Sequence, residues 1–282
     1  MQQSQNGAYG PGNIHRKNTD PDFLAAIQEF SENYKDKIKV LIAEPSIGII
    51  NYQSHEAMCD LLCNLKDYER ESDYKFFKTA LGRLLPHYAR EKFCEYALDM
   101  EFDYILFVDD DHCYSPDIFR KLQVHIKDND IVAPLCLQRL APYYPVIYKS
   151  STFEKDGVQY WDNKKYVEEK DFKKGDIITD ATSIGFGLCI LKVELLARVP
   201  RPWFFTSQPI GEDILFCKNA MTVGAKILVD TGIEAPHLKE SEFVTWSDYE
   251  REKNKLDNAV IQESGDAKCS SELPGGEHAA QD

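Results

Sequence analysis

The chain has 282 residues, of which 43% are hydrophobic, and its formal net charge at pH 7 is −14. This length allows one large domain or two small ones, and a strongly acidic protein is repelled by the phosphates of duplex DNA. No apolar run approaches the roughly 18 residues of a membrane span, and the first residues have no signal-peptide pattern. Eight scattered cysteines without a CxxC pair favour buried free thiols and a reducing cytoplasm.

Strand-like apolar runs alternate with helical patterns in the first half of the chain. Residues 1–20 and 263–282 carry little that could pack and are predicted to be disordered tails, leaving one domain over 21–262. The predicted elements are a strand at 38–43, a helix at 55–68, a strand at 74–80, a helix opening at Pro86, a strand within 103–111, a helix at 115–128 with Ser115 as N-cap, and a strand at 130–135. This alternation predicts an α/β fold with a mostly parallel central sheet and helices on both faces.

The second half of the chain changes character and predicts a small antiparallel segment. Its strand-like stretches have Gly-rich joints and cover residues 143–150, 158–163, 164–169 and 176–192. A helix at 212–223, a strand at 225–230 and a further helix near 247–262 complete the predicted domain.

Three acids, Asp109, Asp110 and Asp111, follow the apolar run ILFV. Ligands of open α/β sheets bind outside the carboxyl ends of the strands. In an extended segment Asp109 and Asp111 point the same way and Asp110 points elsewhere. Two carboxylates about 4 Å apart repel by roughly 4 kcal/mol at an effective dielectric near 20, and no Lys or Arg lies within eight residues of them. Bound Mn²⁺ or Mg²⁺ would relieve this repulsion; the alternative is a solvated acidic turn that caps the next helix.

An ordered set of motifs over about residues 38–240 resembles the GT-A glycosyltransferases, especially the family 2-like group of bacteria and their phages. The motifs are VLIAEP, ILFVDDD, APLCLQRLAPYYPV, ATSIGFGLCILKVELL, RPWFF, GEDILFCKNA and APHL. The resemblance implies a single GT-A (Rossmann-like) domain that moves a sugar from a UDP- or GDP-sugar to an acceptor hydroxyl, using Mn²⁺ or Mg²⁺. It leaves the acceptor open among a glycan, a lipid, a protein and a modified DNA base.

The resemblance also implies which residues hold the nucleotide-sugar donor and the metal. The two outer acids, Asp109 and Asp111, match the DxD motif that contacts ribose and metal, and Asp111 is the more direct ligand. His237 is implied as an additional metal ligand, whereas His112 is expected to support the site or to lie on the surface. The donor-binding residues are Ala43, Glu44, Pro45, Arg90, Asp109 and Asp110.

Catalysis is implied at the start of the predicted helix 212–223. Asp213, with Glu212, matches an ED motif whose carboxylate deprotonates the acceptor hydroxyl in inverting enzymes, which suits a general base on a rigid element. Acids in a first helical turn also favour the helix dipole. Because histidine-assisted metal sites occur in retaining enzymes too, the stereochemical outcome stays open.

The acceptor or sugar is implied to contact residues from the second half of the chain, Arg139, Gly185, Phe186, Gly187 and Trp203. Glycine permits close backbone approach to a ligand but also marks strand bulges, and core packing is the alternative for Trp203. The QxxRW motif of processive synthases is absent.

Two other functions fit parts of the pattern. A haloacid-dehalogenase-like phosphohydrolase would use the first Asp of DDDHC as a nucleophile, with Cys113 in place of the usual Thr, but no GDxxxD motif follows. A non-catalytic nucleotide-sugar-binding protein would share the fold without turnover.

Overall fold

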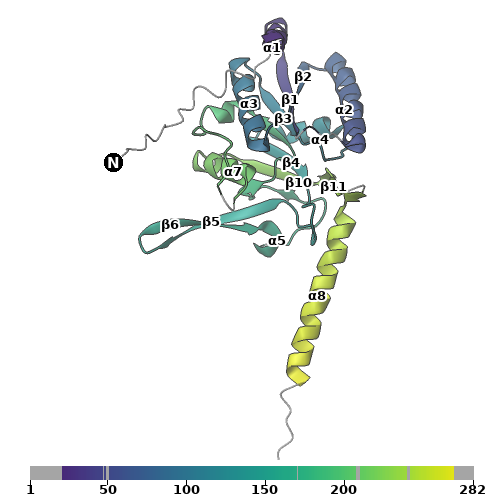
Figure 1. Cartoon of the computed structure of the whole chain (residues 1–282), viewed down its shortest axis with the longest axis vertical. Coiled ribbons are helices and arrows are strands. Elements are labelled where there is room, and N and C mark those ends of the chain that lie inside the picture. Colours follow the sequence, from purple (N-terminus) through teal and green to yellow (C-terminus); the bar gives the residue numbers. More distant parts are fainter. Residues whose placement is uncertain are drawn as a thin grey trace, which may run out of the picture.

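The structure, a computed structural model, describes residues 21–46, 48, 51–169, 171–207, 210–239 and 242–269. The predicted tail at 1–20 lies outside these residues. Within them, seven strands form a central sheet (Figure 1), in the order β2 (Tyr74–Gly82), β1 (Ile38–Ser46), β3 (Tyr104–Val108), β9 (Leu188–Lys192), β4 (Ile131–Leu135), β10 (Ile227–Glu234) and β7 (Ile177–Ile178). β1 runs parallel to β2 and β3, and β4 runs parallel to β10. β9 is antiparallel to both of its neighbours.

Helices cover both faces of this sheet because alternate strand residues point to opposite sides. Leu41 and Ala43 pack into the core cluster shared with α1 (Pro21–Asn33), α3 (Pro86–Asp99), α6 (Val193–Leu196) and α7 (Glu212–Thr222). Val40 and Ile42 pack into the cluster shared with α2 (Tyr52–Glu71) and α4 (Ile118–Ile126). The α/β class with a mostly parallel sheet and helices on both faces is therefore confirmed.

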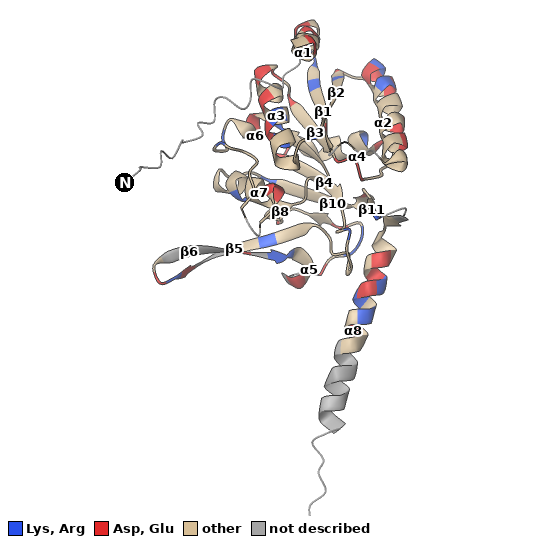
Figure 2. Cartoon of the chain, in the orientation of Figure 1, with Lys and Arg blue, Asp and Glu red and all other residues tan. Residues whose placement is uncertain are grey.

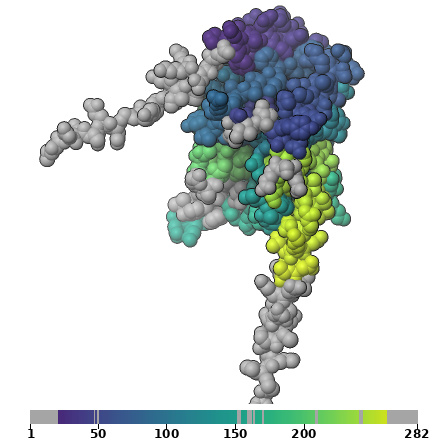
Figure 3. All heavy atoms as spheres, turned by 45° about the vertical axis from the view of Figure 1, so that its right-hand side comes forward, coloured from purple at the N-terminus to yellow at the C-terminus, as the bar shows by residue number. Residues whose placement is uncertain are grey.

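Two small antiparallel sheets and two further helices complete the described chain. One sheet contains β6 (Val158–Lys165), β5 (Ile147–Lys155) and β8 (Ser183–Ile184), and the other pairs β11 (His237–Lys239) with β12 (Glu242–Val244). α5 (Tyr166–Glu169) is short, and α8 (Trp246–Cys269) extends away from the body (Figures 1 and 3). Acidic and basic residues alternate along the first part of α8, as on a solvated helix (Figure 2). None of the helices within the described ranges has the length and apolarity to cross a bilayer.

The structure differs from the predicted elements at several places. α1, α6, β11 and β12 are not among the predicted elements. α4 begins at Ile118 with Asp117 as N-cap, and Ser115, the predicted N-cap, donates its hydroxyl to the Asp117 carboxylate (2.6 Å). Residues 166–169 form α5 and not a strand, and α8 continues through 263–269, which was predicted to belong to a tail. Residues 270–282 lie outside the described residues.

Candidate active site

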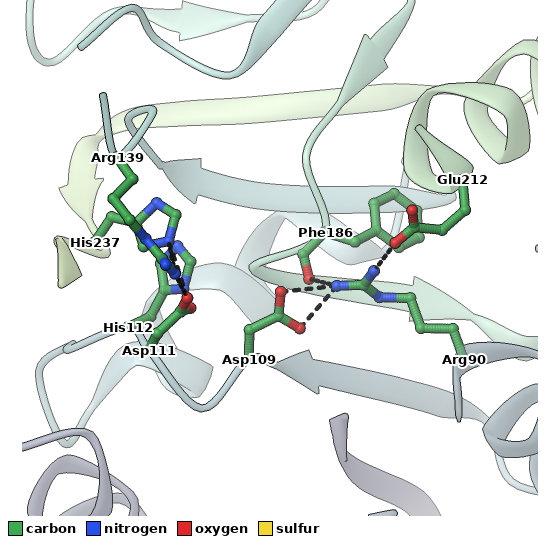
Figure 4. Close-up of polar contacts among 8 residues, drawn as sticks. All are labelled: Arg90, Asp109, Asp111, His112, Arg139, Phe186, Glu212 and His237. Atoms are coloured by element: carbon green, nitrogen blue, oxygen red, sulfur yellow. Dashed lines mark hydrogen bonds and ion pairs between the residues drawn. The ribbon is translucent and has the colours of Figure 1, made fainter. Parts of the chain in front are cut away.

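The acidic segment lies at the carboxyl end of β3, where backbone hydrogen bonds fix it against β11. The amide of Leu238 donates to the carbonyl of Asp111 (2.8 Å), and the amide of Cys113 donates to that of Pro236 (2.9 Å). β3 ends at Val108, so the acids are not part of a regular strand and their side chains diverge. Asp109 faces Arg90, whereas Asp111 faces two histidines (Figure 4). The predicted convergence of Asp109 and Asp111 through strand alternation is therefore wrong.

Asp111, His112 and His237 form a group that could hold a metal ion. Their ligand atoms all lie within 4.8 Å of one another. The distance from Asp111 Oδ1 to His112 Nδ1 is 3.0 Å, and the distance from Asp111 Oδ2 to His237 Nε2 is 3.1 Å. The two imidazole rings stack with their centroids 4.4 Å apart. A carboxylate with imidazoles suits Mn²⁺ and related divalent ions.

His237 is oriented in the manner of a metal ligand. Its Nδ1 lies 3.1 Å from the carbonyl oxygen of Leu137, which can only accept a hydrogen bond. In the tautomer that carries its proton on Nδ1, the ring would donate to Leu137 and present the Nε2 lone pair on the side of Asp111 Oδ2. Metal-binding histidines generally donate their other ring N–H in this way. The residues present fit the predicted ion, although Asp109 does not belong to the group and His112, expected only to support the site, does.

Arg90 neutralises two of the acids from within the protein. Its side chain is buried, and its Nη2 donates to both carboxylate oxygens of Asp109, at 2.7 and 2.8 Å. Nη1 donates to Glu212, and the carbonyl of Phe186 also accepts from Nη2 (3.3 Å). Burial would lower the pKa of Arg90, but Asp109 and Glu212 raise it above its usual range, so the guanidinium stays charged.

Two arginines that are distant in the sequence lie beside the acids in the fold. The acids lack a nearby Lys or Arg in the sequence, but the fold brings Arg90 to Asp109 and Arg139 to Asp111. Repulsion between the acids therefore does not by itself require a metal. Burial still raises the pKa of Asp109 above its usual range, and Arg90 offsets this only in part. Arg90 connects the carboxyl end of β3 to the start of α7 through its two terminal nitrogens, whereas its buried Nε has no hydrogen-bond partner among the described residues.

Asp213 follows Glu212 in the first turn of α7 but has a different environment. One carboxylate oxygen accepts from the amide of Ile214 (2.7 Å), and the described residues place no cation in an ion pair with it. Burial and the neighbouring charge of Glu212 raise the pKa of Asp213 to about 6, against the opposing effect of Arg90. A carboxylate with this pKa is mostly ionised at pH 7 and is a stronger base than an ordinary aspartate.

Gly185 and Gly187 link the surroundings of Asp213 to those of His112. A Cβ atom on Gly187 would lie 2.3 Å from His112 Cε1, so only glycine leaves room for that ring. A Cβ atom on Gly185 would lie 2.6 Å from a methyl group of Val146 and 3.6 Å from Asp213 Oδ2. Both glycines thus admit close protein side chains, and the segment between them runs from the candidate base to the candidate metal group.

The residues predicted to contact the nucleobase lie at the end of β1, beside β3. Ala43 is fully buried in the core, and Pro45 is buried too. Glu44 is buried and pairs with Lys78 (2.6 Å). Asp110 differs, because its Oδ2 is buried and has no hydrogen-bond partner among the described residues. Burial also raises the pKa of Asp110, although a hydrogen bond with Ser46 opposes the rise.

The aromatic residues predicted to face a sugar belong to the core. Trp203 is 2% exposed, and its indole N–H donates to the carbonyls of Leu196 (3.0 Å) and Val199 (3.2 Å). Phe186 is buried among the rings of Phe107, Phe204 and Phe216. The core alternative therefore holds for Trp203, and the predicted sugar contact is wrong for the side chain of Phe186.

Arg139 lies on the exposed side of the metal group. Its Nη2 donates to Asp111 Oδ2 and lies 3.2 Å from His237 Nε2 (Figure 4). The side chain is 49% exposed. Arg139 was predicted to contact the acceptor or sugar, and the structure places it beside the candidate metal ligands. No local pattern in the sequence indicates this position.

Comparisons with solved structures show similarity of fold. A197 from STIV is 20% identical, with a TM-score of 0.46 over 72% of this chain and 86% of its own. GalNAc-T7, solved with UDP, GalNAc and Mn²⁺, is 12% identical, with a TM-score of 0.45 over 83% of this chain and 56% of its own. TarS 1-349 from S. aureus is 15% identical, with a TM-score of 0.34 over 73% of this chain and 59% of its own. No protein-family model and no curated protein sequence matches the chain.

Proposed function

We propose that this protein is a glycosyltransferase that transfers a sugar from a UDP- or GDP-sugar to an acceptor hydroxyl, with Mn²⁺ or Mg²⁺ as cofactor. The observation that carries the proposal is the close approach of Asp111 Oδ2 and His237 Nε2, 3.1 Å apart, at the carboxyl end of β3. When bound there, the metal would supply positive charge to the diphosphate leaving group. Asp111 and His237 would hold the metal ion, and His112 would either orient these ligands or act as a third ligand.

Asp213 is the proposed general base. Its carboxylate is mostly ionised at neutral pH and can accept the proton of an acceptor hydroxyl, which favours an inverting reaction. Glu212 has a different role, because Arg90 holds it in an ion pair. Arg90 therefore acts as a positioning residue that fixes the start of α7, and with it Asp213, relative to Asp109.

Asp110 is the proposed contact for the donor nucleoside. A buried carboxylate oxygen without a partner costs free energy unless a ligand donates to it. Asp110 Oδ2 is such an atom, and the ribose hydroxyls of a nucleotide are suitable donors. Glu44 and Pro45, at the end of the adjacent strand β1, would line the nucleobase side of this position.

The geometry does not favour a haloacid-dehalogenase-like phosphohydrolase. In that reading Asp109 must attack phosphorus, but Arg90 binds both oxygens of its carboxylate. Cys113, at the position of the usual Thr, directs its thiol toward the carbonyl of Gln53 (3.5 Å). These contacts hold Asp109 in a structural ion pair rather than leaving it poised as a nucleophile.

A thermal-shift screen of UDP- and GDP-sugars with and without Mn²⁺ tests the proposal. A ligand that binds the folded state raises its melting temperature by mass action. We expect a donor-dependent rise that needs Mn²⁺ and that disappears in Asp111→Asn, followed by release of nucleoside diphosphate in the presence of acceptor. A Mn²⁺-independent rise, or an equal rise in Asp111→Asn, would refute the metal site. Donor binding without nucleotide release would instead favour a non-catalytic binding protein.

A further inference from the structure

We infer that Arg139 holds the cation position of this site in the metal-free protein, and that it turns to the donor diphosphate when a divalent ion takes that position. The inference rests on the proposed function and adds a binding role for Arg139 and an order of events. Its starting point is the contact of one guanidinium nitrogen with both Asp111 and His237.

One guanidinium nitrogen of Arg139 donates to Asp111 Oδ2 and lies 3.2 Å from His237 Nε2. These are the two atoms that would ligate the metal, and they lie 3.1 Å from each other. The guanidinium therefore supplies the positive charge beside the Asp111 carboxylate at the position where a metal would bind. A metal bound to the same two atoms would have to displace it, because two cations cannot share the position.

The loop that carries Arg139 allows this exchange without a change of backbone. Its base is closed by hydrogen bonds from Val146 N to Cys136 O (2.9 Å) and from Gln138 N to Tyr144 O (2.9 Å). Arg139 follows at the tip, where its side chain is half exposed. The same loop presents the Leu137 carbonyl that orients His237. The loop thus keeps the metal ligand in place while its arginine leaves.

A displaced guanidinium would find the donor phosphates within its reach. Asp111 and His237 would hold the metal, which would attract the negatively charged diphosphate, and the planar fork of Arg139 would suit phosphate oxygens in two hydrogen bonds. Arg139 would therefore oppose metal binding in the free protein and assist nucleotide binding once the metal is present. These two effects have opposite signs, which a purely structural role would not produce.

Titration calorimetry on the full chain separates these effects. The first titration adds Mn²⁺ alone to wild type, Arg139→Gln and Arg139→Lys. Since a half-exposed ion pair contributes little, we expect Arg139→Gln to bind Mn²⁺ about two- to fivefold more tightly than wild type. The second titration adds UDP or GDP at saturating Mn²⁺. Loss of charge-assisted hydrogen bonds should weaken nucleotide binding by at least about tenfold in Arg139→Gln, and by less in Arg139→Lys.

A matched control is Arg198→Gln, which removes another half-exposed arginine that pairs with an aspartate, Asp130, at 2.5 Å. It should change neither titration. Unchanged or weaker Mn²⁺ binding by Arg139→Gln would overturn the exchange, and unchanged nucleotide binding would overturn the phosphate contact. If wild type binds neither Mn²⁺ nor nucleotide, the proposed function fails as well. If wild type binds both and Arg139→Gln matches it, only this inference fails.

Discussion

Replacing Asp213 by Asn should make the protein more stable and less active. The pKa of Asp213 is raised from 3.8 to about 6, mainly by burial. The folded protein therefore binds this proton more tightly than the unfolded chain does. The stabilising effect of the proton is fully present below pH 4 and is lost as the pH rises through about 6. Above that pH, the ionised carboxylate opposes folding.

The size of the effect follows from the pKa values. A change of one in pKa corresponds to about 1.4 kcal/mol. Ionisation of Asp213 therefore lowers the free energy of unfolding by at most about 3 kcal/mol at pH 8 and by about 1.5 kcal/mol at pH 5. Asn keeps an oxygen that can accept from the Ile214 amide but carries no charge. We expect the stability advantage of Asp213→Asn over wild type to grow by about 1.5 kcal/mol between pH 5 and pH 8.

Urea unfolding of both proteins at pH 5, 6, 7 and 8 measures this difference, with Asp60→Asn as a control at an exposed aspartate. The control should differ from wild type by less than about 0.5 kcal/mol at every pH. Turnover by Asp213→Asn should fall by about 10²–10⁴-fold, since the base is lost. A destabilised variant at pH 8, or a stability difference that does not change with pH, would refute the account of Asp213. Normal turnover would remove it as the base.

Three further substitutions test the surroundings of the site. Arg90→Met leaves two partly buried carboxylates unpaired and should cost about 3–5 kcal/mol in denaturant unfolding, whereas Arg70→Gln, at an exposed pair, should cost under about 1 kcal/mol. Gly187→Ala forces a methyl group against the ring of His112. This variant should bind Mn²⁺ more weakly in calorimetry and should lose about 1–3 kcal/mol of folding stability. Gly82→Ala is the control, because the space around its Cα is open, and it should leave Mn²⁺ binding unchanged. Trp203→Phe should lower stability without changing the KM for acceptor, and a raised KM would restore the sugar contact.

The sheet could be predicted from the sequence because its strands are short apolar runs between helical patterns. The strands β1, β3 and β4 and the start of α3 at Pro86 were found in this way. Helix α1 was missed although its buried face repeats with helical spacing, as in Phe23, Ile27 and Phe30. The start of α4 was misplaced because Ser115 and Asp117 are both good caps, and only the folded loop decides between them.

The candidate site was predictable in its local motifs and not in its long-range pairs. The acids after β3 and the ED pair at α7 stand out by residue type and position. Arg90, by contrast, meets Glu212 across 122 positions of sequence, and Arg139 meets Asp111 across 28. No periodicity encodes such contacts, since they arise when separate elements dock. Trp203 was ambiguous for the same reason: an indole suits a sugar platform and a core equally, and burial is a property of the whole fold.

The position of β9 has a consequence for how the protein is made. This strand inserts between β3 and β4, but it is synthesised long after both of them. A nascent chain therefore displays unsatisfied strand edges for much of its time on the ribosome, and such edges invite aggregation and chaperone binding. His237, a proposed metal ligand, follows every strand of the central sheet in the sequence, so the proposed metal site is completed only after all of these strands have been synthesised.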